Sequence, residues 1–94
     1  MLRPRRAFSQ PQVLRLYSRP GCCLCDQVQE ALAPWLQSGK LSLKVVNIED
    51  DPELESRFGQ VIPVLEDPEG RVLAKGKFRV EEAMARWQRR RKAR

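Results

Sequence analysis

The chain has 94 residues, of which 41% are hydrophobic and 32% are charged, with no histidine and a formal net charge of +6. This length suits one small domain with a correspondingly small core. No apolar run approaches the roughly 18 residues of a membrane-spanning helix, so we expect no membrane partner.

The positive charge belongs to the two ends of the chain. Residues 1–12 carry three arginines and no acid, and we expect them to form a flexible basic extension. Residues 86–94 carry five arginines, one lysine and no acid. Such a run attracts nucleic-acid phosphates, but cations also favour the negative end of a helix dipole. We favour the helix end, followed by a basic tail over residues 88–94, and expect no nucleic-acid partner.

The first predicted element is a strand over Gln12–Ser18, in which two leucines alternate with the other residues. The sequence RPG then breaks the strand. A helical pattern begins at Cys22, with apolar residues at spacings of three and four. We expect Pro34 to kink or shorten the last turn of this helix and Gly39 to end it.

The second half of the chain alternates further. We expect a strand over Lys40–Glu49, then a short helix with Asp51 as N-cap, Pro52 in its first turn and Gly59 just past its end. Turn chemistry at DPEG predicts a hairpin between strands at Gln60–Asp67 and Arg71–Ala74. Apolar residues at helical spacing predict an amphipathic helix over residues 79–91.

The resulting order is βαβαββα, which predicts an α/β fold with a four-stranded mixed sheet flanked by three helices around one core. The two early β–α alternations imply parallel pairing through right-handed crossovers. The later hairpin adds an antiparallel edge. We place this domain at residues 13–87.

All three cysteines lie within four positions, Cys22, Cys23 and Cys25. A secreted domain stapled by disulfides would spread an even number along the chain, so the cluster indicates a reducing compartment. The N-terminus lacks the apolar segment of a secretory signal. We therefore expect the protein in the cytoplasm. The mitochondrion is a minor alternative, because the first residues are basic.

Cys22 and Cys25 form the natural dithiol pair, because positions i and i+3 share one helix face. Cys23 points elsewhere on the helix and fits neither partner. A sulfur at the helix start lies near free N–H groups and the positive dipole end, and Arg19 adds a nearby cation. We expect both effects to lower the pKa of Cys22. Cys25, one turn inside, should be more buried, which suits thiol–disulfide exchange.

Metal or iron–sulfur binding through all three cysteines is the alternative. A zinc site takes four ligands, usually cysteine or histidine, and this chain has no histidine. A metal would therefore require a carboxylate, an outside thiol or a second subunit. We assign no metal ligand.

Pro63 lies inside the apolar run VIPVL, although an inner strand excludes proline because proline cannot donate to the ladder. Either the residue belongs to an edge strand with a trans bond, or a cis Ile62–Pro63 bond precedes the strand.

The motifs YSRPGCCLCD and VIPVL resemble those of glutaredoxins, most of all the small glutaredoxin-like proteins, over about residues 13–87. The resemblance implies a thioredoxin-like βαβαββα fold with Cys22 as nucleophile and Cys25 as resolving thiol. It also implies that substrate or glutathione is bound by residues around the dithiol, namely Arg19, Cys23, Leu24, Ile62 and the cis-proline Pro63.

The resemblance implies a thiol–disulfide oxidoreductase of cell redox homeostasis, with no tightly bound cofactor. A disulfide-containing protein or glutathione would be its partner, and we expect a monomer. A non-catalytic binding module of the same fold is a further alternative. The chain departs from common glutaredoxins by carrying Cys23-Leu24 in place of Pro-Tyr and Val61-Ile62 in place of Thr-Val. Only Gly76 and Glu81 stand in for the downstream Gly-Gly and Asp.

Overall fold

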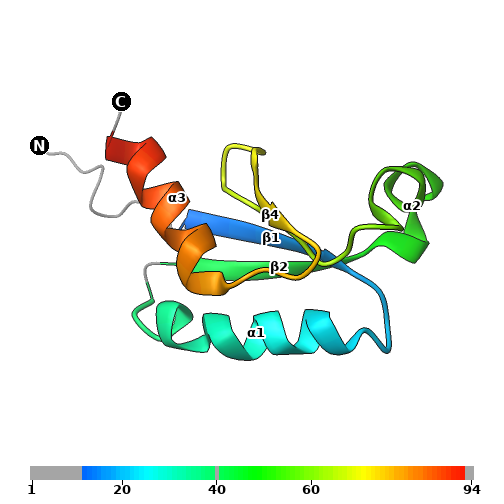
Figure 1. The fold of residues 1–94 in the computed structure, drawn as a ribbon, viewed down its shortest axis with the longest axis horizontal. Coiled ribbons are helices and arrows are strands. Elements are labelled where there is room, and N and C mark those ends of the chain that lie inside the picture. The colour runs from blue at the N-terminus through cyan, green and yellow to red at the C-terminus, as the bar shows by residue number, and fades with distance from the viewer. Residues whose placement is uncertain (1–11, 40, 93–94) are drawn as a thin grey trace, which may run out of the picture.

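The computed structural model describes residues 12–39 and 41–92. The elements follow the predicted order (Figure 1): β1 (Gln12–Ser18), α1 (Cys23–Leu36), β2 (Leu41–Asn47), the 3₁₀ turn η1 (Ile48–Asp50), α2 (Pro52–Phe58), β3 (Val64–Glu66), β4 (Val72–Lys75) and α3 (Val80–Lys92). The basic extension predicted for residues 1–12 lies outside the described residues except for Gln12, which opens β1. None of the described helices has the length and apolar character needed to cross a membrane.

The sheet is mixed, with strand order β2-β1-β3-β4. β1 and β2 are parallel, as the first β–α alternation predicts, but β3 is antiparallel to β1. The expectation of parallel pairing from the second alternation was therefore wrong. The seven residues of α2 span about 10 Å at ~1.5 Å per residue, too short to carry the chain back along β2. The chain instead enters β3 beside the end of β1, where Val64 pairs with Tyr17.

Two prolines lie near the ends of elements. The third strand is shorter than Gln60–Asp67, because Pro63 has no N–H for the ladder and the strand begins only after it. Pro34 does not end α1, which continues to Leu36. A hydrogen bond from Ser38 Oγ to the carbonyl of Trp35, at 3.1 Å, follows at the end of the helix. Gly39 then turns the chain with a positive φ of 79°.

The core consists of two apolar clusters. The larger one joins Leu14 and Leu16 of β1 to the inner faces of α1 and α3, through Val28, Leu32, Leu65, Leu73, Val80, Ala83, Met84 and Trp87. The smaller one joins Tyr17, Ile48, Phe58 and Val64 where α2 meets the sheet. In Figure 1, α2 stands at the end of the sheet opposite the C-terminal end of α3. The second cluster therefore supports the end of β1 from which the chain continues into α1.

A buried polar group accompanies the smaller cluster. The hydroxyl of Tyr17 donates a 2.9 Å hydrogen bond to Oε1 of Glu66, and Arg15 Nη1 lies 3.5 Å from the same oxygen. The Tyr17 ring packs on Phe58 with centroids 4.7 Å apart. Burial, then the hydrogen bond to Glu66, raises the pKa of Tyr17 above its ordinary value of 10.0.

Asp67 organises the turn between β3 and β4. Its side chain is fully buried and accepts 2.9 Å hydrogen bonds from the backbone N–H groups of Glu69 and Arg71. The Arg71 side chain lies 3.3 Å from Oδ2, and Arg90 of α3 lies 3.8 Å from the same oxygen. One carboxylate therefore holds the turn and fastens the end of α3 to it.

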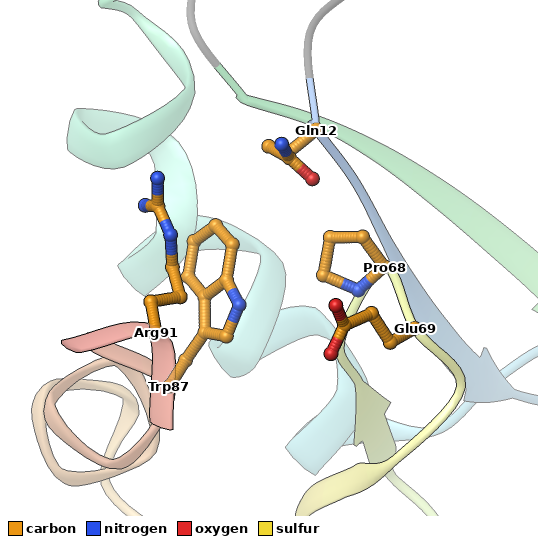
Figure 2. Close-up of a pocket in the computed structure, with 5 residues that line it drawn as sticks. All are labelled: Gln12, Pro68, Glu69, Trp87 and Arg91. Carbon is orange, nitrogen blue, oxygen red and sulfur yellow. The ribbon is translucent and has the colours of Figure 1, made fainter. Parts of the chain in front are cut away.

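The basic C-terminal residues lie largely on α3, which includes residues 88–92 of the expected tail. Arg86 donates to the carbonyl of Leu73, and Arg90 to that of Val72 at 3.5 Å. Arg91 lies over the Trp87 ring, 4.9 Å from its centroid. A hollow of about 160 Å³ at this end is lined by Gln12, Pro68, Glu69, Trp87 and Arg91. Figure 2 shows these five side chains.

The raised pKa of Tyr17 predicts a pH dependence of stability. Tyr17 is the only tyrosine, so phenolate absorbance reports this residue alone. The unfolded chain releases the phenolic proton near 10.0 and the folded chain only at higher pH. The free energy of unfolding should therefore fall as pH rises from 10.0 through the folded pKa. Chemical denaturation across this pH range should show a smaller decrease in the free energy of unfolding for Tyr17→Phe than for the unmodified protein. Parallel curves would contradict it.

The buried Asp67 carboxylate predicts a large loss of stability on its removal. Asp67→Ala leaves two backbone N–H donors without their acceptor. We expect the free energy of unfolding to drop by about 2–4 kcal/mol, because an unsatisfied buried donor costs about 1–3 kcal/mol and these two donors are only part-buried. Denaturant unfolding measures this, with Glu30→Ala on the exposed side of α1 as a control that should change stability by less than about 0.5 kcal/mol. Equal effects in both variants would contradict the assignment.

Candidate active site

The loop after β1 turns directly into α1 at the cysteine cluster. Gly21 adopts a positive φ of 81°, which glycine tolerates without strain. Cys22 follows in an extended conformation and is the N-cap residue of α1. Its Sγ accepts a 3.2 Å hydrogen bond from the backbone N–H of Cys25. The sulfur thus satisfies one of the free N–H groups of the first helical turn, as the sequence predicts.

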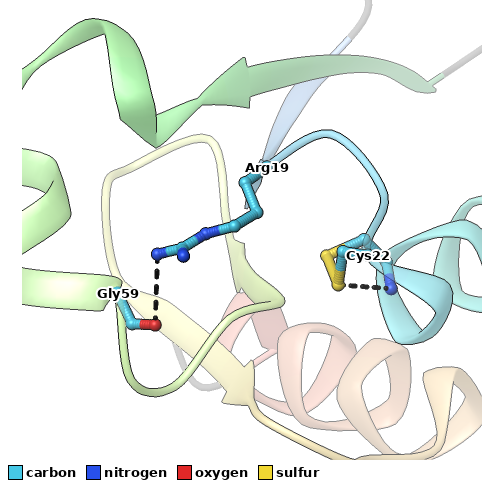
Figure 3. Close-up of a disulfide and its surroundings, with 4 residues drawn as sticks. Arg19, Cys22 and Gly59 are labelled. Atoms are coloured by element: carbon cyan, nitrogen blue, oxygen red, sulfur yellow. Dashed lines mark hydrogen bonds between the residues drawn. A yellow bond between two sulfur atoms is a disulfide. The ribbon is translucent and has the colours of Figure 1, made fainter.

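Cys22 and Cys25 form a disulfide, with Cα atoms 5.2 Å apart, within the usual range for such bonds. Figure 3 shows the bond across the first turn of α1. Cys22 is half-buried, whereas Cys25 is only 1% exposed. The predicted pairing is therefore present, and the two sulfurs differ in access to solvent.

Cys23 stands apart from this pair. It is the first residue of α1, is exposed and is free of any disulfide. At ~3.6 residues per turn, its side chain points about 200° away from that of Cys25. Among residues 12–39 and 41–92, no three side chains of the metal-binding types lie close enough together to hold an ion. The three sulfurs consequently do not converge on one point.

Arg19 lies at the start of the loop between β1 and α1, which we call the active-site loop. Its Nη2 lies 2.8 Å from Oε2 of Glu55 and donates to the carbonyl of Gly59 at 3.4 Å. Figure 3 shows the side chain extending toward Gly59 and away from Cys22. Its Nε is buried and has no hydrogen-bond partner among the described residues. Arg19 therefore connects the loop before Cys22 to the end of α2, and its charge is matched by Glu55.

The Ile62–Pro63 peptide bond is cis, as the resemblance implies. Pro63 is buried and immediately precedes β3, an inner strand between β1 and β4. The alternative of a trans proline in an edge strand is therefore excluded. Ile62 is half-buried beside the smaller cluster. Within the part of the chain that the structure describes, neither backbone group of Ile62 forms a hydrogen bond.

The loop after β4 is tied to the cis-proline segment. The backbone N–H of Gly76 lies 2.8 Å from the carbonyl of Val61 and 2.9 Å from that of Pro63. This contact places the residues that follow Gly76 at the end of the sheet where β1 runs into α1. Gly76 and Glu81, the weak counterparts of the glutaredoxin Gly-Gly and Asp, both lie in this region.

A recess of about 210 Å³, which the sequence patterns did not predict, lies between this loop and α1. From α1 it is lined by Leu24, Gln27, Val28 and Ala31, and from the β4–α3 connection by residues 76–81. The sequence carries one signal for it. Both hairpin strands precede the segment KFR, so antiparallel pairing returns that segment to the end of the sheet that carries the cysteines.

The family profile of the Glutaredoxin-like domain (DUF836) matches residues 13–88. The protein Ne2328 from Nitrosomonas europaea, solved by NMR, is 25% identical with a TM-score of 0.71, and the match covers 84% of this chain and 93% of that one. The protein XcR50 from X. campestris, solved by X-ray crystallography, is 41% identical with a TM-score of 0.64, over 80% of this chain and 95% of that one. No curated protein is similar enough to count as a match.

The close approach of Arg19 to the end of α2 predicts that Gly59 cannot be enlarged freely. A β-carbon at Gly59 would lie 2.6 Å from the carbonyl oxygen of Glu55 and 3.3 Å from Arg19 Nη2. We expect Gly59→Ala to lower the free energy of unfolding by about 1–3 kcal/mol, because this crowding forces backbone to move.

Gly39→Ala provides the comparison, since nothing lies within 4 Å of its β-carbon position and only its positive φ is strained. We expect that variant to lose about 1 kcal/mol, with a less perturbed spectrum around Arg19 and Glu55. Denaturant unfolding and NMR shifts measure both. A Gly59→Ala protein as stable as the parent would show that the contact is not tight.

Proposed function

Because the chain belongs to the family of the glutaredoxin-like domain, we propose that it is a thiol–disulfide oxidoreductase acting through Cys22 and Cys25. The single observation that carries the proposal is the disulfide between the N-cap residue of α1 and a buried cysteine one turn inside. The resemblance to known glutaredoxins supports the same roles for these two positions.

In the proposed reaction the reduced protein supplies two electrons. The Cys22 thiolate attacks one sulfur of the substrate disulfide, forms a mixed disulfide and expels the other substrate sulfur as a thiolate, which takes up a proton. Cys25 then loses its proton and attacks Sγ of Cys22. This closes the Cys22–Cys25 bond and releases the second substrate thiol. The substrate disulfide is reduced to two thiols, and the protein dithiol is oxidised to the disulfide.

The first turn of α1 favours Cys22 as the attacking group. The sulfur lies at the N-terminal end of a fourteen-residue helix, where the helix dipole and free N–H groups stabilise a thiolate in the reduced protein. The 3.2 Å contact with the N–H of Cys25 is one such stabilising interaction. The charge of Arg19 is already paired with Glu55. The N-terminus of α1, and not Arg19, therefore stabilises the Cys22 thiolate. Arg19 then acts by holding the active-site loop against α2.

The two thiols have complementary access. Cys22 is half-buried at the mouth of the loop, whereas Cys25 is 1% exposed. A substrate disulfide therefore reaches Cys22 first, and Cys25 reacts only within the protein. This order suits release of the substrate by an internal resolving thiol.

We expect the substrate to lie across the cis-proline loop. The free backbone groups of Ile62 are suited to pair with an extended peptide, with Pro63 behind them and with Cys23 and Leu24 at the helix side. A disulfide-containing protein or glutathione fits this role, glutathione as a co-substrate and not as a bound cofactor. We place the protein in the reducing cytoplasm as a monomer.

Metal or iron–sulfur binding by the three cysteines is the alternative class of function. The exposed Cys23 points away from the Cys22–Cys25 pair, so one subunit presents no convergent set of sulfur ligands. No observation on the described residues favours this alternative over dithiol exchange.

The proposed roles predict different outcomes for the three cysteines. Cys22→Ser should abolish disulfide reduction, because it removes the attacking sulfur. Cys25→Ser should accumulate a stable mixed disulfide on Cys22, because the resolving thiol is missing. Cys23→Ser is the matched control and should retain both exchange and the internal bridge. Mass spectrometry of the trapped adducts and the rate of disulfide reduction measure these outcomes.

A redox titration completes the test. The Cys22–Cys25 pair should titrate as one two-electron couple. A potential near −270 mV (about that of thioredoxin) indicates a reductant, and one near about −120 mV an oxidant. If no internal disulfide forms in a redox buffer and Cys22 is alkylated as slowly as an ordinary thiol of pKa about 8.5, the proposal that the protein is an oxidoreductase is wrong.

A further inference from the structure

The recess between α1 and the β4–α3 connection extends to the first turn of α1, the turn that the disulfide spans. Leu24, which lies between Cys22 and Cys25 in sequence, forms part of its wall. Val28 lies one turn beyond Cys25 on the same helix and also lines it. A substrate chain whose disulfide is attacked at Cys22 therefore has the recess within reach of its neighbouring residues.

The floor of the recess is apolar. Val28 and Val80 are buried, and Phe78 packs against the larger core cluster. Leu24 and Ala31 add apolar wall from α1. The volume of about 210 Å³ exceeds the roughly 150 Å³ of an engineered apolar cavity that binds benzene. One large apolar side chain, such as leucine, methionine or phenylalanine, fits this space.

The charged groups at the rim are mainly positive. Lys77 and Arg79 are exposed lining residues, and Glu81 is the one acid among the lining residues. The four lining residues of α1 are all uncharged. The acids of that helix, Asp26 and Glu30, are exposed and are not lining residues. The rim therefore complements a negatively charged group carried next to an apolar one.

We propose that this recess selects the substrate: the preferred disulfide belongs to a protein segment in which a large apolar residue and an acidic residue follow the attacked cysteine. The apolar side chain enters the recess beside Leu24, and the carboxylate lies near Lys77 and Arg79. This inference rests on the proposed dithiol exchange and names its substrate class. Glutathione, which has carboxylates but no large apolar side chain, fills the recess poorly.

Four peptide probes test the proposal with the full-length reduced protein. Each is a short blocked peptide with one cysteine, held in a mixed disulfide with 2-mercaptoethanol, and the cysteine is followed by Leu-Glu, Leu-Lys, Ser-Glu or Ser-Lys. Bis(2-hydroxyethyl) disulfide is the reference substrate without a peptide. We expect kcat/KM to be highest for the Leu-Glu probe and lowest for the Ser-Lys probe.

Lys77→Glu and Lys75→Glu form a matched pair, because both residues are exposed and only Lys77 lines the recess. Lys77→Glu should reduce the preference for Leu-Glu over Leu-Lys by about fivefold, as expected for an exposed charge contact worth about 1 kcal/mol. Lys75→Glu should leave that preference unchanged. Ala31→Trp should fill the recess and remove the preference for leucine over serine, while reduction of the reference disulfide continues.

The outcomes separate the two proposals. Equal reduction of the four probes, or equal effects of the two lysine variants, overturns the recess as a selector while leaving dithiol exchange intact. Failure to reduce even bis(2-hydroxyethyl) disulfide overturns the proposed function, and the substrate class falls with it. Circular dichroism and thermal unfolding of each variant show whether a lost preference reflects a lost fold.

Discussion

The site depends on the sulfur of Cys22 acting as the cap of α1. A helix start needs an acceptor for its free N–H groups, and here the acceptor is the atom that also bonds to Cys25. The same first turn therefore sets where the helix begins, which sulfur faces solvent and which is buried. Gly21 makes this possible, because its positive φ lets the chain leave β1 and turn at once into α1.

The antiparallel entry of β3 gathers the remaining parts of the site. Since Val64 pairs with Tyr17, the cis-proline lies at the same end of the sheet as the cysteines. β4 then returns the chain to that end, where the backbone N–H of Gly76 donates hydrogen bonds to the carbonyls of Val61 and Pro63. Three segments far apart in sequence thus meet beside the dithiol, and Arg19 connects the cysteine loop to the end of α2 through Glu55 and Gly59.

Residues with strong local preferences made parts of the fold and of the site predictable from the sequence. Asp51, Pro52 and Gly59 carry the start and stop signals of α2, and the helix occupies Pro52–Phe58 as expected. The pairing of Cys22 with Cys25 follows from helical spacing alone. Pro63 is different, because its local sequence allows two conformations and only the resemblance to glutaredoxins favoured the cis bond. The prediction of parallel pairing for β3 was wrong, because α2 is too short to return the chain along β2. The partner of Arg19 and the recess near Leu24 arise from tertiary packing, which periodicity does not encode.

The arginines of α3 have a consequence for how copies of this protein meet in solution. β4 is an outermost strand, and outermost strands tend to recruit strands from other molecules through their main-chain groups. Arg86 and Arg90 donate to the carbonyls of Leu73 and Val72, so cationic groups stand over this strand. A neighbouring chain that approached along β4 would have to displace them and would bring a second set of like charges. Arg86 and Arg90 thus engage main-chain carbonyls of β4 that a strand added along this edge would need.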